Sequence, residues 1–208
     1  MGKAKEKFER VLRVVRHRVR GGKLPPGCRI SAAELAEELR LSTTPVRQAL
    51  AQLAGEGLLE GRAGDGYFVP QADTEDISDL YRTRGRLVCL AIARWPSADG
   101  RAPVPGDPVL GDRDVDRLEH RLRQMVRRAG SEALTGLFDR LCDRLAFLAA
   151  AEEACVDAPA AELALLEALF QVGDARKLEK AVLEAHERRA AMAGPIKSES
   201  RVHSGASS

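Results

Sequence analysis

One stretch of the chain, residues 24–69, constrains the fold more than any other. Apolar residues at helical spacing predict a helix over residues 31–40, with Ser31 as its N-cap, and a second helix over residues 43–55, capped by Ser42. Only a tight turn fits between them, so the two helices must cross at a steep angle. The start of the second helix then protrudes, and in helix-turn-helix proteins this is the end that enters the major groove of DNA.

A β-hairpin is predicted directly after the second helix. Gly57 ends the helix, residues 58–59 begin a strand, residues 63–66 form the turn, and residues 67–69 return. With a further helix over residues 6–20, these elements form a winged helix-turn-helix domain of three helices and a β-hairpin wing. Unrelated small α+β domains also combine helix, helix and hairpin, so the close spacing of the elements carries the prediction.

The charge is distributed unevenly along the 208 residues. The formal net charge is only +2, but residues 1–70 contain 13 Lys and Arg against 8 Asp and Glu. This part therefore carries +5 and the remainder −3. A basic first part beside an acidic second part is consistent with DNA contact by the first part alone.

The sequence also restricts the compartment. The four cysteines are scattered without CxxC spacing, as expected for thiols in a reducing cytosol. No apolar run approaches the length needed to cross a bilayer. We therefore expect a cytoplasmic protein with no membrane partner.

Beyond residue 70 the sequence predicts an all-α helical bundle, which makes the fold class mainly α. A helix over residues 74–95, with Leu87 and Leu90 facing inward, is followed by a Pro- and Gly-rich loop at residues 96–112. Further helical patterns occupy residues 113–128, 131–151, 159–172 and 175–193. The predicted organisation is thus a winged helix domain (1–70), a linker (71–75), a helical domain (76–193) and a disordered, Ser- and Lys-rich tail (194–208).

Four short motifs follow one another in the first part: Leu24-Pro25-Pro26-Gly27, Thr44-Pro45-Val46-Arg47, Glu56-Gly57-Leu58 and Gly66-Tyr67-Phe68-Val69. In sequence and in order they resemble the GntR family of bacterial transcription regulators. Leu80-Tyr81 with Arg84, and Leu166-Glu167-Ala168-Leu169, resemble more weakly the helical (FCD-like) effector domain of the FadR-type branch. The resemblance implies a homodimeric repressor or activator that binds double-stranded DNA through its first domain. Residues 76–193 would then bind a small-molecule effector and form the dimer.

The candidate DNA-contacting residues lie at the front of the second helix and at the hairpin tip: Ser42, Thr43, Thr44, Arg47, Gln48 and Gly66. Hydroxyl groups and a helix N-terminus bind phosphate. Arg47 can reach N7 and O6 of a guanine, and Gln48 is the second candidate for a base contact. Alternatively, Arg47 clamps a phosphate or forms a surface salt bridge.

The first domain departs from the GntR pattern at three positions where the family commonly has a basic residue: Ala33, Thr43 and Asp65. An acidic residue at the hairpin tip is repelled by a minor groove. We therefore consider two interpretations: a regulator with an atypical operator, or a regulator-derived protein-interaction module with weakened or lost operator binding. No nucleophile–base pairing, phosphate loop or paired carboxylates in the sequence indicates an enzyme.

Many members of the FadR-type branch hold a divalent metal with one aspartate and three histidines. The resemblance places Asp116, His120 and His186 at three of these positions. The remaining position falls on Glu162 or Leu163, and only the glutamate can ligate zinc or a similar ion.

The helical pattern of residues 113–128 supports a different interpretation of two of these residues. Its apolar residues define one face, and Asp116 and His120 fall nearly opposite that face. On this interpretation they form an exposed pair on a solvated helix surface.

Two arginines of the second domain, Arg84 and Arg144, resemble effector-facing positions of the family. A guanidinium pairs with a carboxylate through two hydrogen bonds, so the expected effector is an organic acid. The alternative for Arg84 is an ordinary ion pair between helices.

Overall fold

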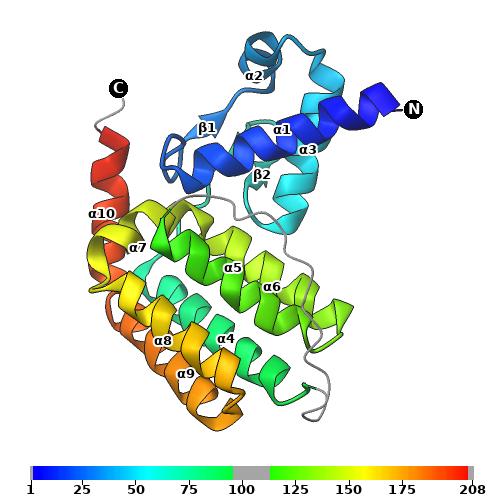
Figure 1. Cartoon of the computed structure of the whole chain (residues 1–208). Helices are drawn as coiled ribbons and strands as arrows, with labels where there is room; N and C mark the ends of the chain where they lie inside the picture. Colours follow the sequence, from blue (N-terminus) through cyan, green and yellow to red (C-terminus); the bar gives the residue numbers. More distant parts are fainter. Residues whose placement is uncertain (1, 96–112, 206–208) are drawn as a thin grey trace.

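The computed structural model describes residues 2–95 and 113–205 (Figure 1). The predicted loop at residues 96–112 lies outside the described residues. The described elements, in chain order, are α1 (Gly2–Arg20), β1 (Arg29–Ile30), α2 (Ala32–Leu39), α3 (Thr43–Glu56), β2 (Glu60–Arg62), β3 (Gly66–Phe68), α4 (Thr74–Ile92), α5 (Asp114–Arg127), α6 (Glu132–Leu145), a 3-10 turn η1 (Ala146–Leu148), α7 (Ala149–Cys155), α8 (Pro159–Val172), α9 (Ala175–Ala191) and α10 (Ala193–Gly205). The predicted fold class, a winged helix followed by a helical bundle, is confirmed.

The winged-helix part, residues 2–69, contains a sheet of three strands rather than a hairpin alone. The strand order is β1-β3-β2, and both pairings are antiparallel. Sequence reasoning missed β1, which is two residues long and pairs Arg29 with Phe68 and Ile30 with Tyr67. The strand predicted from Leu58 begins only at Glu60, because residues 58–59 turn inward and are buried in the core.

The helical bundle, residues 74–205, differs from its prediction at several helix ends. Helix α4 is capped by Asp73, whose carboxylate accepts a hydrogen bond from the Asp76 N–H at 2.8 Å. The single helix predicted over residues 131–151 is divided by η1 into α6 and α7. Leu90, predicted to face inward, is 54% exposed.

The predicted disordered tail is wrong for most of its length, because residues 193–205 form helix α10. Ile196 is fully buried and Ser200 is almost so. Helix α10 packs along α7 and the start of α4, and Figure 1 shows it at the side of the bundle beside the winged-helix part. The polar composition of this segment concealed the apolar residues that hold it in place.

The hydrophobic core does not divide at the linker. One cluster joins buried residues of the winged-helix part to residues of the bundle: Val15, Val19, Leu50 and Val69 with Ile77, Tyr81, Leu148 and Ile196. A second cluster fills the far end of the bundle between α4, α5, α6 and α9. The end of the bundle that carries the winged helix is thus packed against it as one body (Figure 1).

Helices α4 and α9 approach each other most closely at Gly85. A Cβ atom added there would lie 2.8 Å from Cγ and 2.9 Å from Cβ of His186, which is itself buried. We expect Gly85→Ala to lower the free energy of unfolding by roughly 1–3 kcal/mol through overpacking, despite the better helix propensity of alanine. Urea unfolding followed by circular dichroism measures the change.

The matched control for this substitution is Gly136→Ala in the middle of α6, where an added Cβ meets nothing within 4 Å. Here only the helix propensity acts, so the free energy of unfolding should rise by up to about 1 kcal/mol. Equal changes for both variants would show that the contact between Gly85 and His186 is not restrictive.

Candidate DNA-binding surface and the interior of the bundle

Helix α3 exposes one face from its first residue onward. Its apolar face is buried against α1 and α2 through Val46, Leu50 and Leu53. The other face carries the five helix residues predicted to contact DNA, all of them exposed: Ser42, Thr43, Thr44, Arg47 and Gln48. The Ser42 hydroxyl makes no capping hydrogen bond to this helix, so the first-turn N–H groups are left for an external acceptor.

The turn between α2 and α3 fixes the direction of this surface. Ser31 caps α2 as predicted, because its hydroxyl accepts from the Glu34 N–H at 3.2 Å. Arg40 ends α2 in the left-handed region, with φ 54°, and the Leu41 N–H donates to the Ala36 carbonyl at 2.8 Å. This closed turn lets α3 begin only two residues later and project from the domain.

The wing tip carries two arginines that sequence reasoning did not select. Arg29 of β1 donates from Nε to the Asp65 carbonyl at 2.9 Å, and it lies beside the half-buried Gly66. The Arg62 guanidinium stacks over the ring of Phe68, 4.2 Å from its centre. Both arginines are exposed, but Arg62 also pairs with Glu60 at 3.2 Å, so the basic charge beside Asp65 comes mainly from Arg29. The antiparallel register that brings Arg29 to the wing tip cannot be recognised from the sequence around Arg29.

The four predicted metal ligands are bound to other side chains in the bundle. Asp116 is 4% exposed, which corrects the expectation of an exposed pair, and it accepts two hydrogen bonds from Arg113 at 2.8 and 3.2 Å. His120 is half-buried and lies 2.9 Å from the Gln124 amide. Among the described residues, no three His, Cys, Asp or Glu side chains group together so as to hold a metal ion.

His186 is buried and uses both ring nitrogens. Its Nδ1–H donates to the Val182 carbonyl at 2.7 Å, and its Nε2 accepts from Arg84 Nε at 3.2 Å. Burial, together with the charges of Arg84 and Arg189, holds the pKa of His186 well below its usual value, so the ring is neutral. Because its free lone pair is directed at a guanidinium, His186 does not fit the role of a metal ligand.

The interior of the bundle contains a buried charge cluster centred on Arg189. This arginine is fully buried and binds Glu152 through Nε and Glu162 through Nη1, both at 2.6 Å. The Tyr81 hydroxyl donates to the second oxygen of Glu152 at 2.8 Å, and Arg188 binds the second oxygen of Glu162 at 2.8 Å. Both carboxylates are therefore neutralised by arginine, and the donor set does not fit a divalent ion.

The two predicted effector-binding arginines have different surroundings. Arg84 is buried beside His186, with its guanidinium 5.3 Å from the centre of the Tyr81 ring. Arg144 is exposed on α6, and its Cγ lies 3.2 Å from the Cβ position of Gly57 in the winged-helix part. One faces the bundle interior and the other the domain contact, so the structure does not bring them together as one site.

The exposed recognition helix, the three-stranded sheet and the basic wing together define a winged helix DNA-binding domain. Residues 7–69 match the family described as bacterial regulatory proteins, gntR family. The similarity to this family is thus carried by the winged-helix part of the chain.

Two relatives share this domain. The chain is 42% identical over 62 residues to the Nta operon transcriptional regulator of Aminobacter aminovorans, and 33% identical over 79 residues to the HTH-type transcriptional regulator McbR of Escherichia coli. These segments cover 30% and 38% of this chain, but only 30% and 36% of the relatives. The similarity of sequence is thus confined to about a third of each relative, and both relatives are named as regulators rather than enzymes.

Solved structures extend the similarity of fold to most of the chain. E. coli McbR/YncC matches with a TM-score of 0.65 at 19% identity, and a GntR transcriptional regulator from Rhodococcus sp. RHA1 with 0.68 at 17%. Each comparison covers 90% of this chain and 97% of the other. In this chain, none of the helices within residues 2–95 and 113–205 has the length and apolar character to span a membrane.

Proposed function

We propose that this protein is a ligand-responsive transcriptional regulator that binds operator DNA as a homodimer. The observation that carries the proposal is the exposed face of α3, where Ser42, Thr44 and Arg47 stand clear of the domain. The hydroxyls and the helix N-terminus suit phosphate, and Arg47 suits the O6 and N7 acceptors of a guanine. The two relatives named as regulators share this region of the sequence.

The wing supports DNA binding over a purely protein-binding role. Arg29 and Arg62 surround the tip at which Asp65 alone would repel a phosphate backbone. Positive side chains at a wing add backbone contacts that depend on salt but not on base sequence. A protein-interaction module without operator binding has no need of this arrangement.

A dimer would place two such reading heads on two half-sites. The bundle exposes large apolar side chains that a second copy could cover: Leu90, Leu137, Leu165, Val172 and Leu183. The effector would act by favouring one spacing of the two heads, and its leverage is limited by how strongly it prefers that spacing.

The function is tested by binding of the full chain to a labelled duplex from the upstream region of its own gene. We expect Arg47→Ala to weaken specific binding by roughly 5- to 150-fold, since a bidentate contact to guanine contributes about 1–3 kcal/mol of discrimination. Fluorescence anisotropy over a series of salt concentrations measures the change, with Arg94→Ala as the control. Arg94 is also exposed and its replacement removes the same charge, but it lies just after α4 in the bundle, away from α3.

Specific binding that survives Arg47→Ala unchanged would contradict the role given to α3. No binding to any duplex even at low salt would contradict the regulator itself and favour the interaction module. An equal loss of affinity for the duplex with Arg94→Ala would show that only the net charge of the protein matters.

A further inference from the structure

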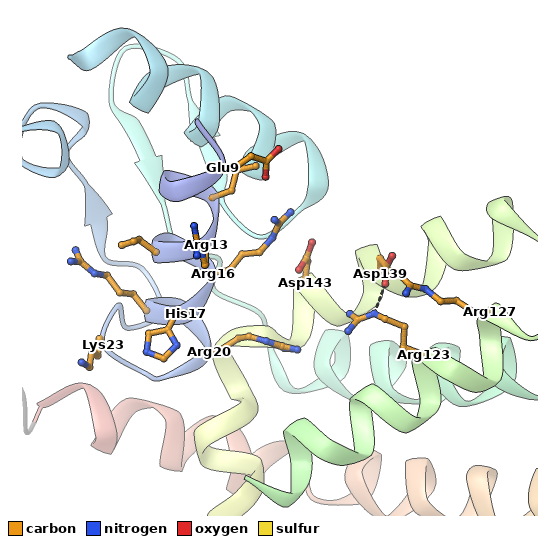
Figure 2. Close-up of a pocket in the computed structure, with 13 residues that line it drawn as sticks. Glu9, Arg13, Arg16, His17, Arg20, Lys23, Arg123, Arg127, Asp139 and Asp143 are labelled. Atoms are coloured by element: carbon orange, nitrogen blue, oxygen red, sulfur yellow. Dashed lines mark hydrogen bonds and ion pairs between the residues drawn. The ribbon is translucent and has the colours of Figure 1, made fainter. Parts of the chain in front are cut away.

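A cleft of about 1060 Å³ lies between the winged-helix part and the bundle. Figure 2 shows it bounded on one side by α1 and on the other by α5 and α6. Its wall includes seven Arg and Lys side chains but only three Asp and Glu. Leu12 and Val14 add an apolar part to the α1 side.

The α1 side of the cleft carries basic side chains without acidic partners. Within the described residues, Arg13, His17 and Lys23 make no ion pair, and all three are exposed to solvent. Figure 2 shows all three, like Arg20, on the winged-helix side of the cleft. Uncompensated positive charge in a concave site raises the local concentration of anions.

The opposite wall presents Arg123 and Arg127 of α5 (Figure 2). Arg123 is held in place by Asp139 at 2.8 Å and Glu119 at 3.3 Å. Its side chain is only 15% exposed, so its position is fixed by packing as well as by charge. A fixed guanidinium is a suitable partner for a carboxylate or phosphate group.

We propose that this cleft binds a small organic anion with two or more negative charges, held between Arg13 and Lys23 of the winged-helix part and Arg123 of the bundle. Carboxylate and phosphate groups share the chemistry that these side chains recognise. The volume is that of a small-molecule site, and the apolar contacts of Leu12 and Val14 suit a carbon skeleton.

A ligand here would touch both parts of the protein at their junction. Arg20, the last residue of α1, is already bonded to Glu119, and its carbonyl accepts from Arg113 Nη2 at 3.0 Å. An anion bridging the same two walls would stabilise this packing of the winged helix on the bundle. This consequence rests on the proposed function, whereas the binding itself does not.

Asp143 on the cleft wall makes the site sensitive to pH. Burial raises the pKa of Asp143 to about 6. The positive charges of Arg16 and Arg20 lower this pKa, whereas the negative charges of Glu56 and Glu119 raise it. Below this pH the carboxyl is protonated and the cleft loses a negative charge. Anion binding should therefore strengthen as the pH falls through this value.

Isothermal titration calorimetry on the full chain at low ionic strength tests the proposal, with citrate as the carboxylate probe and pyrophosphate as the phosphate probe. The variant Arg13→Ser/Lys23→Ser loses two charge-assisted contacts, so its affinity for the tighter-binding probe should fall by about tenfold or more. The control Arg86→Ser/Arg94→Ser removes the same charge from exposed positions at or near α4. Asp139→Asn, which removes a negative charge from the cleft wall while Glu119 still holds Arg123, should strengthen binding.

Asp143→Asn tests the same site with a substitution that should raise the affinity for the anion rather than lower it. At pH 7.5 it should bind the probe more tightly than the native chain, and at pH 5.5 the two should converge because the native carboxyl is then protonated. Comparing both proteins at each pH cancels the ionisation of the probe.

Three results would overturn the proposal. The first is no heat of binding for either probe at 10 mM, a concentration about 10⁴-fold above a micromolar Kd. The others are an equal loss of probe affinity in the cleft variant and its control, or displacement of the probe by acetate at the same concentration. A cleft variant that loses DNA binding but keeps citrate binding would assign these cations to DNA phosphate and also overturn it. Because the calorimetry is done without DNA, its result does not depend on whether the operator experiment succeeds.

Discussion

Replacing Arg189 by methionine is expected to lower the free energy of unfolding by about 3–5 kcal/mol, because it leaves the buried carboxylate of Glu152 without its ion-pair partner, whereas Glu162 keeps Arg188. Arg189 is fully buried, and Glu152 and Glu162 are 5% and 8% exposed. In the native chain burial favours the neutral acid, but Arg189 and Arg84 hold the pKa of Glu152 below its usual value. Urea unfolding at pH 7 measures the loss.

The pH dependence of this loss identifies its cause. The native Glu152 has a lowered pKa, so its stabilising contribution is present at neutral pH and is lost as the pH falls through that pKa. Without Arg189 the same carboxyl is buried and unpaired, so it takes up a proton as the pH falls and the penalty shrinks. The difference between variant and native chain should therefore be smaller at pH 5 than at pH 7.

A second substitution provides the control. Arg189→Met with Glu152→Gln removes the unpaired charge and keeps an oxygen that accepts from Tyr81, so it should recover part of the lost stability. Equal destabilisation of the single and double variants, at both pH values, would mean that packing rather than charge explains the loss.

The second large effect is expected at Glu119, where the two parts of the protein are joined by a buried ion pair. Glu119→Ala leaves Arg20 buried without a partner, and we expect a loss of about 3–5 kcal/mol in the free energy of unfolding. Arg20 is 7% exposed and Glu119 is 9% exposed. Although burial favours the neutral acid, Arg20 and Arg123 hold the pKa of Glu119 below its usual value.

The pair Arg20→Met/Glu119→Leu should be close to the native chain in stability, because apolar residues of similar size replace both charges and Arg123 keeps its partner Asp139. Glu132→Ala, in the exposed first turn of α6, is the control for loss of a surface acid. Urea unfolding again gives the result. A single variant as stable as the control would show that the ion pair contributes little to joining the two parts.

The winged helix could be predicted because its signals are local. The cap at Ser31, the left-handed glycine at Gly57 and the helical spacing of Val46 and Leu50 all lie within one element or its ends. Strand β1 could not be predicted, because its two residues become a strand only through pairing with β3 some forty residues away. The contribution of Arg29 to the wing was missed for the same reason.

The bundle interior was less accessible to prediction because its charges are satisfied by distant residues. Helix α5 buries its apolar face in the bundle as expected, but its polar face is also covered, by α7 and by the end of α1. Asp116 and Glu119 therefore lie inside the protein, where a helical pattern alone places them outside. The spacing of Asp116 and His120 matched a metal-binding family, yet the arginines that occupy the carboxylates come from other helices or from outside the motif.

The shared core of the two parts has a consequence for how such chains can be recombined. Val19 and Leu50 of the winged-helix part pack in the same cluster as Leu148 of η1 and Ile196 of the last helix, α10. Cutting the chain after residue 73 would uncover this apolar surface on both fragments, so neither should be stable alone. Transfer of this winged helix onto another helical domain would succeed only if that domain carried its own equivalent of the final helix.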